Sequence, residues 1–174
     1  MSVSTVRRPR APRNDLVDGL LGASRALMGM TARSMAQVDA ELTLPQFRVL
    51  VVLASRGRQR TAELAQELDV ASSTVTRMCD RLDRRTLIRR YRRGDDRRAT
   101  WVALTESGRD LVGAVMRQRR EHFARVLRSA RIADPAAAAE VLRAFIEAVG
   151  ELPEHDWWQR WRISAEADEA AVAG

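Results

Sequence analysis

Apolar residues recur at helical spacing along the first third of the chain. They begin just after Asp15, and the stripe consists of Leu16, Val17, Leu20, Leu21, Leu27, Met28, Met35 and Val38. This spacing predicts a long first helix. A second helix is predicted over about 44–54, because Thr43 and Gln46 fit a capping box and 55–58 break the pattern. Its interior is apolar nearly all round, so we expect it at the centre of the fold.

The middle of the chain carries two short helical patterns, 61–68 and 72–84, separated by three residues that begin with Asp69. Each pattern opens with a hydroxyl residue, Thr61 or Ser72, of the kind that caps a helix start. Two segments rich in β-forming residues follow at 87–92 and 100–104, joined by the polar segment 93–99. This order predicts a helix, a tight turn, a second helix and then a β-hairpin with a basic tip.

The last third of the chain is again helical in pattern. A long amphipathic helix is predicted from Thr105 to about residue 130, and Asp134 followed by Pro135 marks the start of another that Gly150 ends. Trp157, Trp158 and Trp161 then follow helical spacing. They either cover a ligand or pack on the partner subunit, and packing is the simpler interpretation.

The ends of the chain lack such periodicity. Residues 1–13 are rich in Ser, Pro and Arg and predict a disordered basic arm, and the Ala/Glu-rich residues 164–174 predict a disordered tail. Between them, 14–163 has the size of one domain. The predicted fold class is mainly α with a small β-hairpin.

The charge of the chain indicates what kind of partner it binds. The formal net charge is +7, and all 30 basic residues are Arg. The absence of Lys is best explained by a GC-rich coding bias, but bias does not produce clustering, and residues 84–98 hold eight Arg against two Asp, a net charge of +6. Such a cluster favours a polyanionic partner, because binding releases condensed counterions.

The two short central helices fit a helix-turn-helix motif. Apolar residues stand where the motif needs side chains that clamp its helices together: Leu64, Leu68, Val70, Val75 and Met78. Ala65 supplies the small residue at the crossing, and Asp69 occupies the turn, where its side chain tolerates a left-handed backbone.

On these residues the chain resembles the MarR family of bacterial regulators. The segments that carry the resemblance are LTLPQF (42–47), TAELA (61–65), SSTVTR (72–77), DRL (80–82) and DRRATWVALT (96–105), within about 15–150. The resemblance implies a winged helix-turn-helix lobe over 43–104 and dimerisation helices over 14–40 and 105–163. One departure is Thr86, which stands where such proteins usually have Gly. Because β-branched residues resist positive φ, we expect this junction to be built differently.

The expected partner is double-stranded DNA, bound by a homodimer. Val75, Met78 and Leu82 face inward, which turns Ser73, Thr74, Thr76 and Arg77 outward. We expect Ser72, Ser73 and Thr74 to contact phosphates or the DNA backbone, Arg77 to read guanine through its bidentate fork, and Arg81 to meet phosphate. For Arg77 alone, a solvated surface residue is the equal alternative.

The hairpin supplies the other candidate DNA contacts. The resemblance implies that Arg98 enters the minor groove, where Asp96 can hold its guanidinium in position. Arg93 and Arg97 complete the candidate contacts. For Arg89, Arg90, Arg92 and Arg93 we expect diffuse attraction to phosphate without base readout, and a solvated basic strand is the plain alternative.

Other functions find little support in the sequence. His122, His155 and Cys79 form no nucleophile, base or metal-ligand pattern, so we expect no enzyme, no metal and no cofactor. Cys79 is expected to be a buried apolar residue, with oxidant sensing as the alternative. One cysteine, with no secretory or membrane-spanning segment, suits the cytoplasm.

Two possibilities stay open at this point. The resemblance implies a small aromatic or anionic effector that relieves repression, but no motif identifies it. The competing function is a winged helix used for protein contacts or for sequence-neutral DNA compaction, which needs no regularly spaced operator.

Overall fold

The computed structural model describes the backbone of residues 12–93 and 96–170, and the side chains of 14–91 and 100–164. Its helices are α1 Pro12–Val38, α2 Leu44–Arg56, α3 Thr61–Leu68, α4 Ser72–Arg84, α5 Glu106–Ser129, α6 Pro135–Ala148 and α7 Glu154–Ala170. Its strands are β1 Gln59–Arg60, β2 Ile88–Arg93 and β3 Asp96–Leu104. The predicted class, mainly α with a small β-hairpin, is confirmed.

The strands form one antiparallel sheet in the order β1-β3-β2. The hairpin β2–β3 follows the prediction, with Ile88 opposite Leu104 and Arg90 opposite Val102. Strand β1 was not predicted. It pairs Arg60 with Trp101, and two residues are too short to show the alternation by which a strand is recognised in a sequence.

Helix α2 lies at the centre of the core, as predicted. Val49, Leu50 and Leu53 are completely buried, and α3, α4, α5 and α7 all pack around this helix. Its predicted cap is present, because Gln46 Oε1 accepts a hydrogen bond of 3.0 Å from the Thr43 amide. The helix runs two residues beyond the prediction, to Arg56, and ends where Gly57 takes a φ of 71°.

The prediction of a disordered tail over 164–174 was wrong as far as residue 170, because α7 continues through it. The reason is tertiary. Ser164 Oγ donates a 2.7 Å hydrogen bond to the Ala54 carbonyl of α2, and the Arg109 guanidinium of α5 donates to the Ser164 carbonyl at 3.2 Å. At the other end of the chain, Pro12 and Arg13 belong to α1 instead of the predicted arm, and 1–11 and 171–174 lie outside the described residues.

The junction after α4 also differs from the prediction. Thr86 does adopt a positive φ, 56°. The Thr86 amide donates to the Asp83 carbonyl and the Leu87 amide donates to the Leu82 carbonyl, at 2.8 and 3.0 Å. This is the Schellman pattern, which requires a left-handed residue at this position. The junction therefore has the left-handed backbone conformation that glycine adopts easily, and the β-branched Thr86 holds it under strain.

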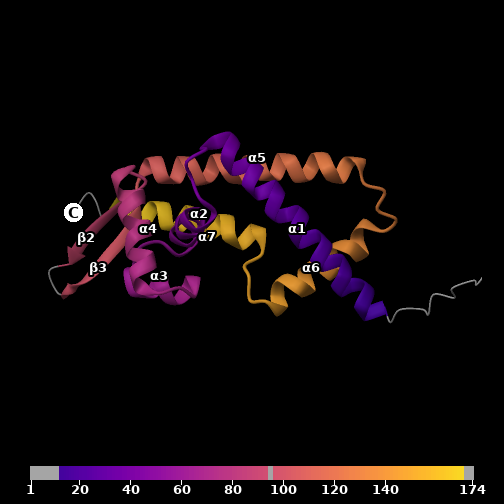
Figure 1. The fold of residues 1–174 in the computed structure, drawn as a ribbon, viewed down its shortest axis with the longest axis horizontal. Coiled ribbons are helices and arrows are strands. Elements are labelled where there is room, and N and C mark those ends of the chain that lie inside the picture. Colours follow the sequence, from indigo (N-terminus) through magenta and orange to yellow (C-terminus); the bar gives the residue numbers. More distant parts are fainter. Residues whose placement is uncertain (1–11, 94–95, 171–174) are drawn as a thin grey trace, which may run out of the picture.

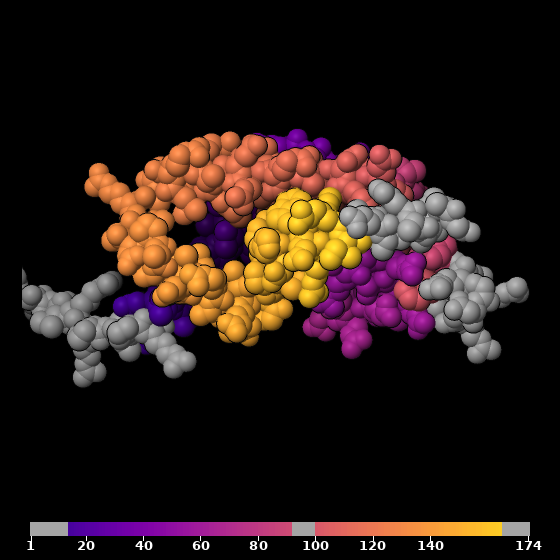
Figure 2. Space-filling model, turned by 180° about the vertical axis from the view of Figure 1, so that it is seen from behind, coloured from indigo at the N-terminus to yellow at the C-terminus, as the bar shows by residue number. Residues whose placement is uncertain are grey.

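Two parts of the molecule are separated along its long axis (Figure 1). Helices α2, α3 and α4 and the sheet form a lobe at one end, and α1, the end of α5, and α6 extend away from it. Helix α6 buries none of its residues. Figure 2 shows a hollow between α5, α6 and α7, with α1 visible behind it.

Candidate nucleic-acid interface

Helix α4 divides into a buried and an exposed face. Val75, Cys79 and Leu82 are completely buried against the lobe. On the opposite face, Ser72, Ser73, Thr76, Arg77 and Arg81 are exposed, and Thr74 is half-buried. Ser73, Thr76 and Arg77 are therefore turned outward, as the spacing predicted, and Thr74 is so only in part.

A tight turn orients this surface. Asp69 has φ 52° and ψ 51°, and the Val70 amide donates to the Ala65 carbonyl at 3.1 Å. The left-handed backbone at Asp69 ends α3 and reverses the chain before α4 begins. The expectation for Asp69 is thus confirmed.

The start of α4 is capped differently from the prediction. Ala71 is the N-cap residue of α4 and Arg60 that of α3, so Ser72 and Thr61 are already the first helical residues. No side chain accepts a hydrogen bond at the start of α4, and Thr61 Oγ1 instead donates to the Thr100 carbonyl of β3 at 3.1 Å. An uncapped helix start leaves amide donors and a positive dipole end for an anion such as a DNA phosphate.

Arg77 lies along the exposed face of α4. Its nearest described partner is Thr74, whose Oγ1 is 3.5 Å from Arg77 Nη2. At the limit of a hydrogen bond, this contact leaves the guanidinium fork available for another acceptor. The Thr76 hydroxyl is engaged, since it donates to the Ser72 carbonyl at 2.9 Å.

Arg90 of β2 ties the hairpin to α4, a role that the sequence analysis missed. Its Nη2 lies 2.8 Å from Asp80 Oδ1 and donates to the Thr76 carbonyl at 3.1 Å. The plain alternative of a solvated strand residue is wrong for Arg90. The pairing of Arg90 with Asp80 can be recognised only in the fold. The sequence offered one signal, which is the acidic residue on the preceding helix.

A second link fastens the base of the hairpin to α3. The Arg60 guanidinium lies over the Trp101 ring, 5.0 Å from its centroid, and Arg60 pairs with Trp101 in the sheet. Cation–π contacts of this kind add to the backbone pairing. The hairpin β2–β3, which we call the wing, is therefore held from both sides, by α4 and by Arg60 at the start of α3.

The other predicted contacts of the wing lie in the same hairpin. Arg93 ends β2 and pairs with Asp96, the first residue of β3, which also contains Arg97 and Arg98. The side chains of these four residues lie outside the described part of the structure. The hairpin brings their backbone positions together at its tip, where β2 ends and β3 begins.

Cys79 is buried within α4 and faces the core. Burial raises the pKa of its thiol to about 11, Arg90 opposes the increase, and Asp80 adds to it. The thiol is thus kept protonated, because a thiolate is poorly solvated in the core. This confirms the expectation of a buried apolar residue.

His122 lies on α5 and His155 on α7, apart from Cys79. No cluster of His, Cys, Asp and Glu suited to a metal ion occurs among the described residues. Within the same part of the chain, no helix is long and apolar enough to cross a membrane.

Comparison with known proteins agrees with this geometry. A family model described as the MarR family matches residues 42–100. The crystal structure of RV1404 from Mycobacterium tuberculosis is 40% identical in sequence, with a TM-score of 0.75, covering 84% of this chain and 99% of that one.

Two curated relatives come from Bacillus subtilis. The uncharacterized HTH-type transcriptional regulator YhbI is 36% identical over 72 residues, which are 41% of this chain and 47% of YhbI. The HTH-type transcriptional repressor MdtR is 35% identical over 86 residues, which are 49% of this chain and 56% of MdtR. The chain thus spans about half the length of these curated relatives.

Proposed function

The chain belongs to the MarR family of DNA-binding transcriptional regulators, and we propose that it acts as a homodimeric repressor of a pseudo-palindromic operator. The observation that carries this proposal is the exposed face of α4, where Ser72, Ser73, Thr76, Arg77 and Arg81 stand together. A recognition helix of this kind enters the major groove with its first turns toward the base edges. We expect the protein to act in the cytoplasm, where chromosomal DNA lies.

Each predicted contact has a place in this proposal. Ser72, Ser73 and Thr74 lie at the uncapped start of α4, where amides and hydroxyls suit phosphate. Arg77 is one turn further along, where we propose that it reads a guanine edge, and we propose that the exposed Arg81, further along α4, meets phosphate. We propose that Arg93, Asp96, Arg97 and Arg98 meet the adjacent minor groove.

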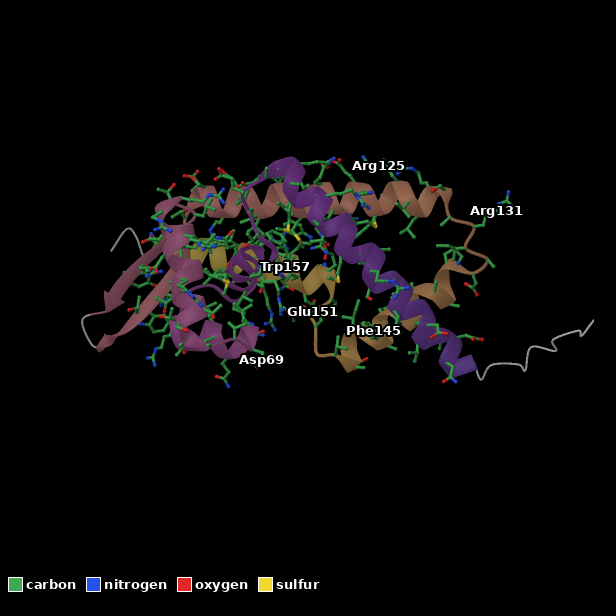
Figure 3. All side chains as sticks on the ribbon, viewed as in Figure 1. Asp69, Arg125, Arg131, Phe145, Glu151 and Trp157 are labelled. Carbon is green, nitrogen blue, oxygen red and sulfur yellow. The ribbon has the colours of Figure 1, made fainter. Side chains whose placement is uncertain are left out.

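Homodimer formation is supported by apolar surface that the single chain leaves open. Helix α6 and the residue that follows it expose a row of apolar side chains: Val141, Leu142, Phe145 and Val149. Helix α1 does the same with Leu16, Val17, Leu21, Leu27 and Met28. Figure 3 shows Phe145 on α6, well away from the lobe. Apolar patches of this extent mark interfaces. A two-fold axis through them would give a dimer with two recognition helices, one from each subunit.

The repressor assignment draws on a relative, MdtR, which is described as a repressor. A regulator of this kind needs a signal that releases it from DNA. By linkage, an effector that lowers DNA affinity must bind the free protein more tightly than it binds the DNA complex.

We propose that this effector binds a cavity of about 420 Å³ beside α5. Met116, Phe123 and Leu127 supply apolar walls, and Arg119 and Glu154 supply charge. The Arg119 guanidinium lies 5.7 Å from the Phe123 ring centroid, and burial lowers its pKa. An aromatic or anionic molecule suits these walls. If a panel of phenolic and other anionic compounds leaves operator affinity unchanged, effector control has no support.

The experiment that tests the proposed function is selection of bound genomic fragments, followed by footprinting of the enriched sites. A sequence-specific regulator protects one short palindromic site in each fragment. An architectural protein coats DNA continuously and enriches no common motif. The second result would replace operator binding by the architectural function.

A further inference from the structure

A second cavity, of about 350 Å³, lies between the end of α2, strand β3 and helix α7. Its walls include Arg58, Trp101, Arg160 and Ile163, and none of its lining residues belongs to α4. Cavities of this size hold small organic molecules. Operator binding, as proposed above, makes no use of it.

The charged side chains that line this cavity in the described part of the chain are Arg56, Arg58 and Arg160. Arg56 is paired with Glu67 at 2.6 Å. Arg58 and Arg160, in contrast, form no ion pair with any other residue that the structure describes. Among the side chains that the structure describes, no acidic one lines the cavity. Two unpaired guanidinium groups that line one cavity repel each other, and an anion bound between them would remove that repulsion.

Trp101 supplies a donor that also lacks an acceptor. Its indole N–H is buried and has no hydrogen-bond partner in the described part of the chain. Buried donors are nearly always paired in proteins, so this group would gain an acceptor if a small shift of the ring opened it to a ligand in the cavity. The two serines of the wall do not compete for that acceptor, because Ser55 Oγ donates to Val51 and Ser164 Oγ donates to Ala54.

The remaining wall is apolar. Ile163 of α7 is 58% exposed although it lines the cavity, and the Trp101 side chain forms another side. A bare inorganic ion would leave this apolar surface in contact with water. A ligand with an apolar body would cover it.

We propose that this cavity binds a small organic anion, with a phosphate or carboxylate group on an aromatic or aliphatic body. The acidic group lies between Arg58 and Arg160 and accepts from the Trp101 indole, and the body packs on Ile163. Such a ligand joins α7 to the connection between α2 and β1. It would fix the C-terminal helix on the lobe without touching the surface that reads DNA.

The test is a titration of the ¹⁵N-labelled full-length protein, followed through the indole N–H resonances of its four tryptophans. The probe is phenyl phosphate, with inorganic phosphate and phenol as its two halves, and Trp101→Phe assigns the resonance. We expect the Trp101 signal to shift saturably with phenyl phosphate, and affinity to be at least ten-fold weaker for either half.

Two variants test the arginines, and a third is the matched control. Arg58→Gln and Arg160→Gln should each weaken phenyl phosphate binding at least ten-fold. Arg131→Gln removes an exposed arginine at the far end of the molecule and should leave binding unchanged (Figure 3).

Four results would overturn the proposal. The first is the absence of a saturable shift at Trp101. The second is that inorganic phosphate binds as tightly as phenyl phosphate, which would mean a site for an adventitious ion only. The third is that phenol binds as tightly as phenyl phosphate, which would mean that the site does not recognise charge. The fourth is that Arg58→Gln and Arg160→Gln weaken binding to random duplex DNA and reduce its salt dependence, while phenyl phosphate binding is unchanged. In that case the arginines serve DNA phosphates.

Discussion

Thr86 holds a strained backbone conformation at the point where α4 leads into the wing. Its φ of 56° is unfavourable for a β-branched residue, and three hydrogen bonds keep it there. They include the 2.5 Å bond from Thr105 Oγ1 to the Thr86 carbonyl, which also fixes the start of α5. Strain at this residue is therefore imposed by the two helices on either side of it.

We predict that Thr86→Gly stabilises the protein by about 1 kcal/mol, because relief of the left-handed strain exceeds the entropy that glycine loses on folding. Chemical denaturation measures the change. Thr86→Ala is the control, since its Cβ keeps most of the strain. A glycine variant less stable than the wild type would show that the Thr86 side chain contributes more than its backbone costs.

Cys79 gives a second prediction at this scale. With a pKa of about 11, its thiol carries very little thiolate at pH 8, and burial blocks access. We expect iodoacetamide to leave the native protein unmodified at pH 8 and to modify it fully in denaturant, as read by mass spectrometry. Rapid modification of the native protein, with loss of DNA binding, would support an oxidant-sensing cysteine instead.

At the scale of elements, α4 and the wing are joined into one unit, and we propose that they contact different grooves of DNA. Arg90 joins them through Asp80 and Thr76, and Arg60 joins the base of the wing to α3. The ion pair itself contributes little stability, because Asp80 is 46% exposed and the pair is screened by solvent. Its effect is on orientation.

We predict different defects when each part loses an arginine. Arg77→Ala should cost about 1 to 3 kcal/mol on the operator and relax preference at one position in each half-site, because a bidentate base contact is lost. Arg98→Ala should weaken binding to all sequences, with less preference for A·T flanks and a shallower salt dependence. Asp96→Ala should show a milder form of the second defect.

Binding titrations against the operator, a core-mutated operator and a flank-mutated operator, at two salt concentrations, separate these outcomes. If Arg98→Ala binds all three as the wild type does, the wing makes no DNA contact. If Arg77→Ala weakens all three equally, Arg77 contacts phosphate instead of a base.

The elements of the lobe were predictable because their signals are local. The bounds of α3 and α4 agree with the prediction, since apolar spacing and the turn at Asp69 mark both helices. Helix α7 beyond Ser164, strand β1 and the role of Arg90 were missed, because each depends on contacts with a distant segment. The prediction for the junction at Thr86 was wrong, because the hydrogen bonds that end α4 override the local preference of a β-branched residue.

At the scale of the whole molecule, the helices outside the lobe expose apolar surface that the proposed dimer would cover. Leu142 of α6 is 55% exposed, Val149 just after α6 is 59% exposed, and Met28 of α1 is 62% exposed. We predict a dimer in sedimentation velocity at micromolar concentration. Leu142→Glu should weaken the dimer, while Glu140→Gln, an exposed polar change on the same helix, should not. A wild-type monomer at that concentration would contradict the dimer.

The central claim is that two copies of α4, held by one dimer, read two half-sites on one face of DNA. A two-fold dimer places these helices about one DNA turn, roughly 34 Å, apart. The most direct measurement is binding to operators with about 5 or about 10 base pairs inserted between the half-sites. The shorter insertion turns the half-sites to opposite faces, and the longer one keeps the face but doubles the distance. We predict that both insertions abolish tight binding, leaving the weak affinity of single half-sites. Unchanged affinity for either operator would contradict the account, because it would mean that the recognition helices bind independently.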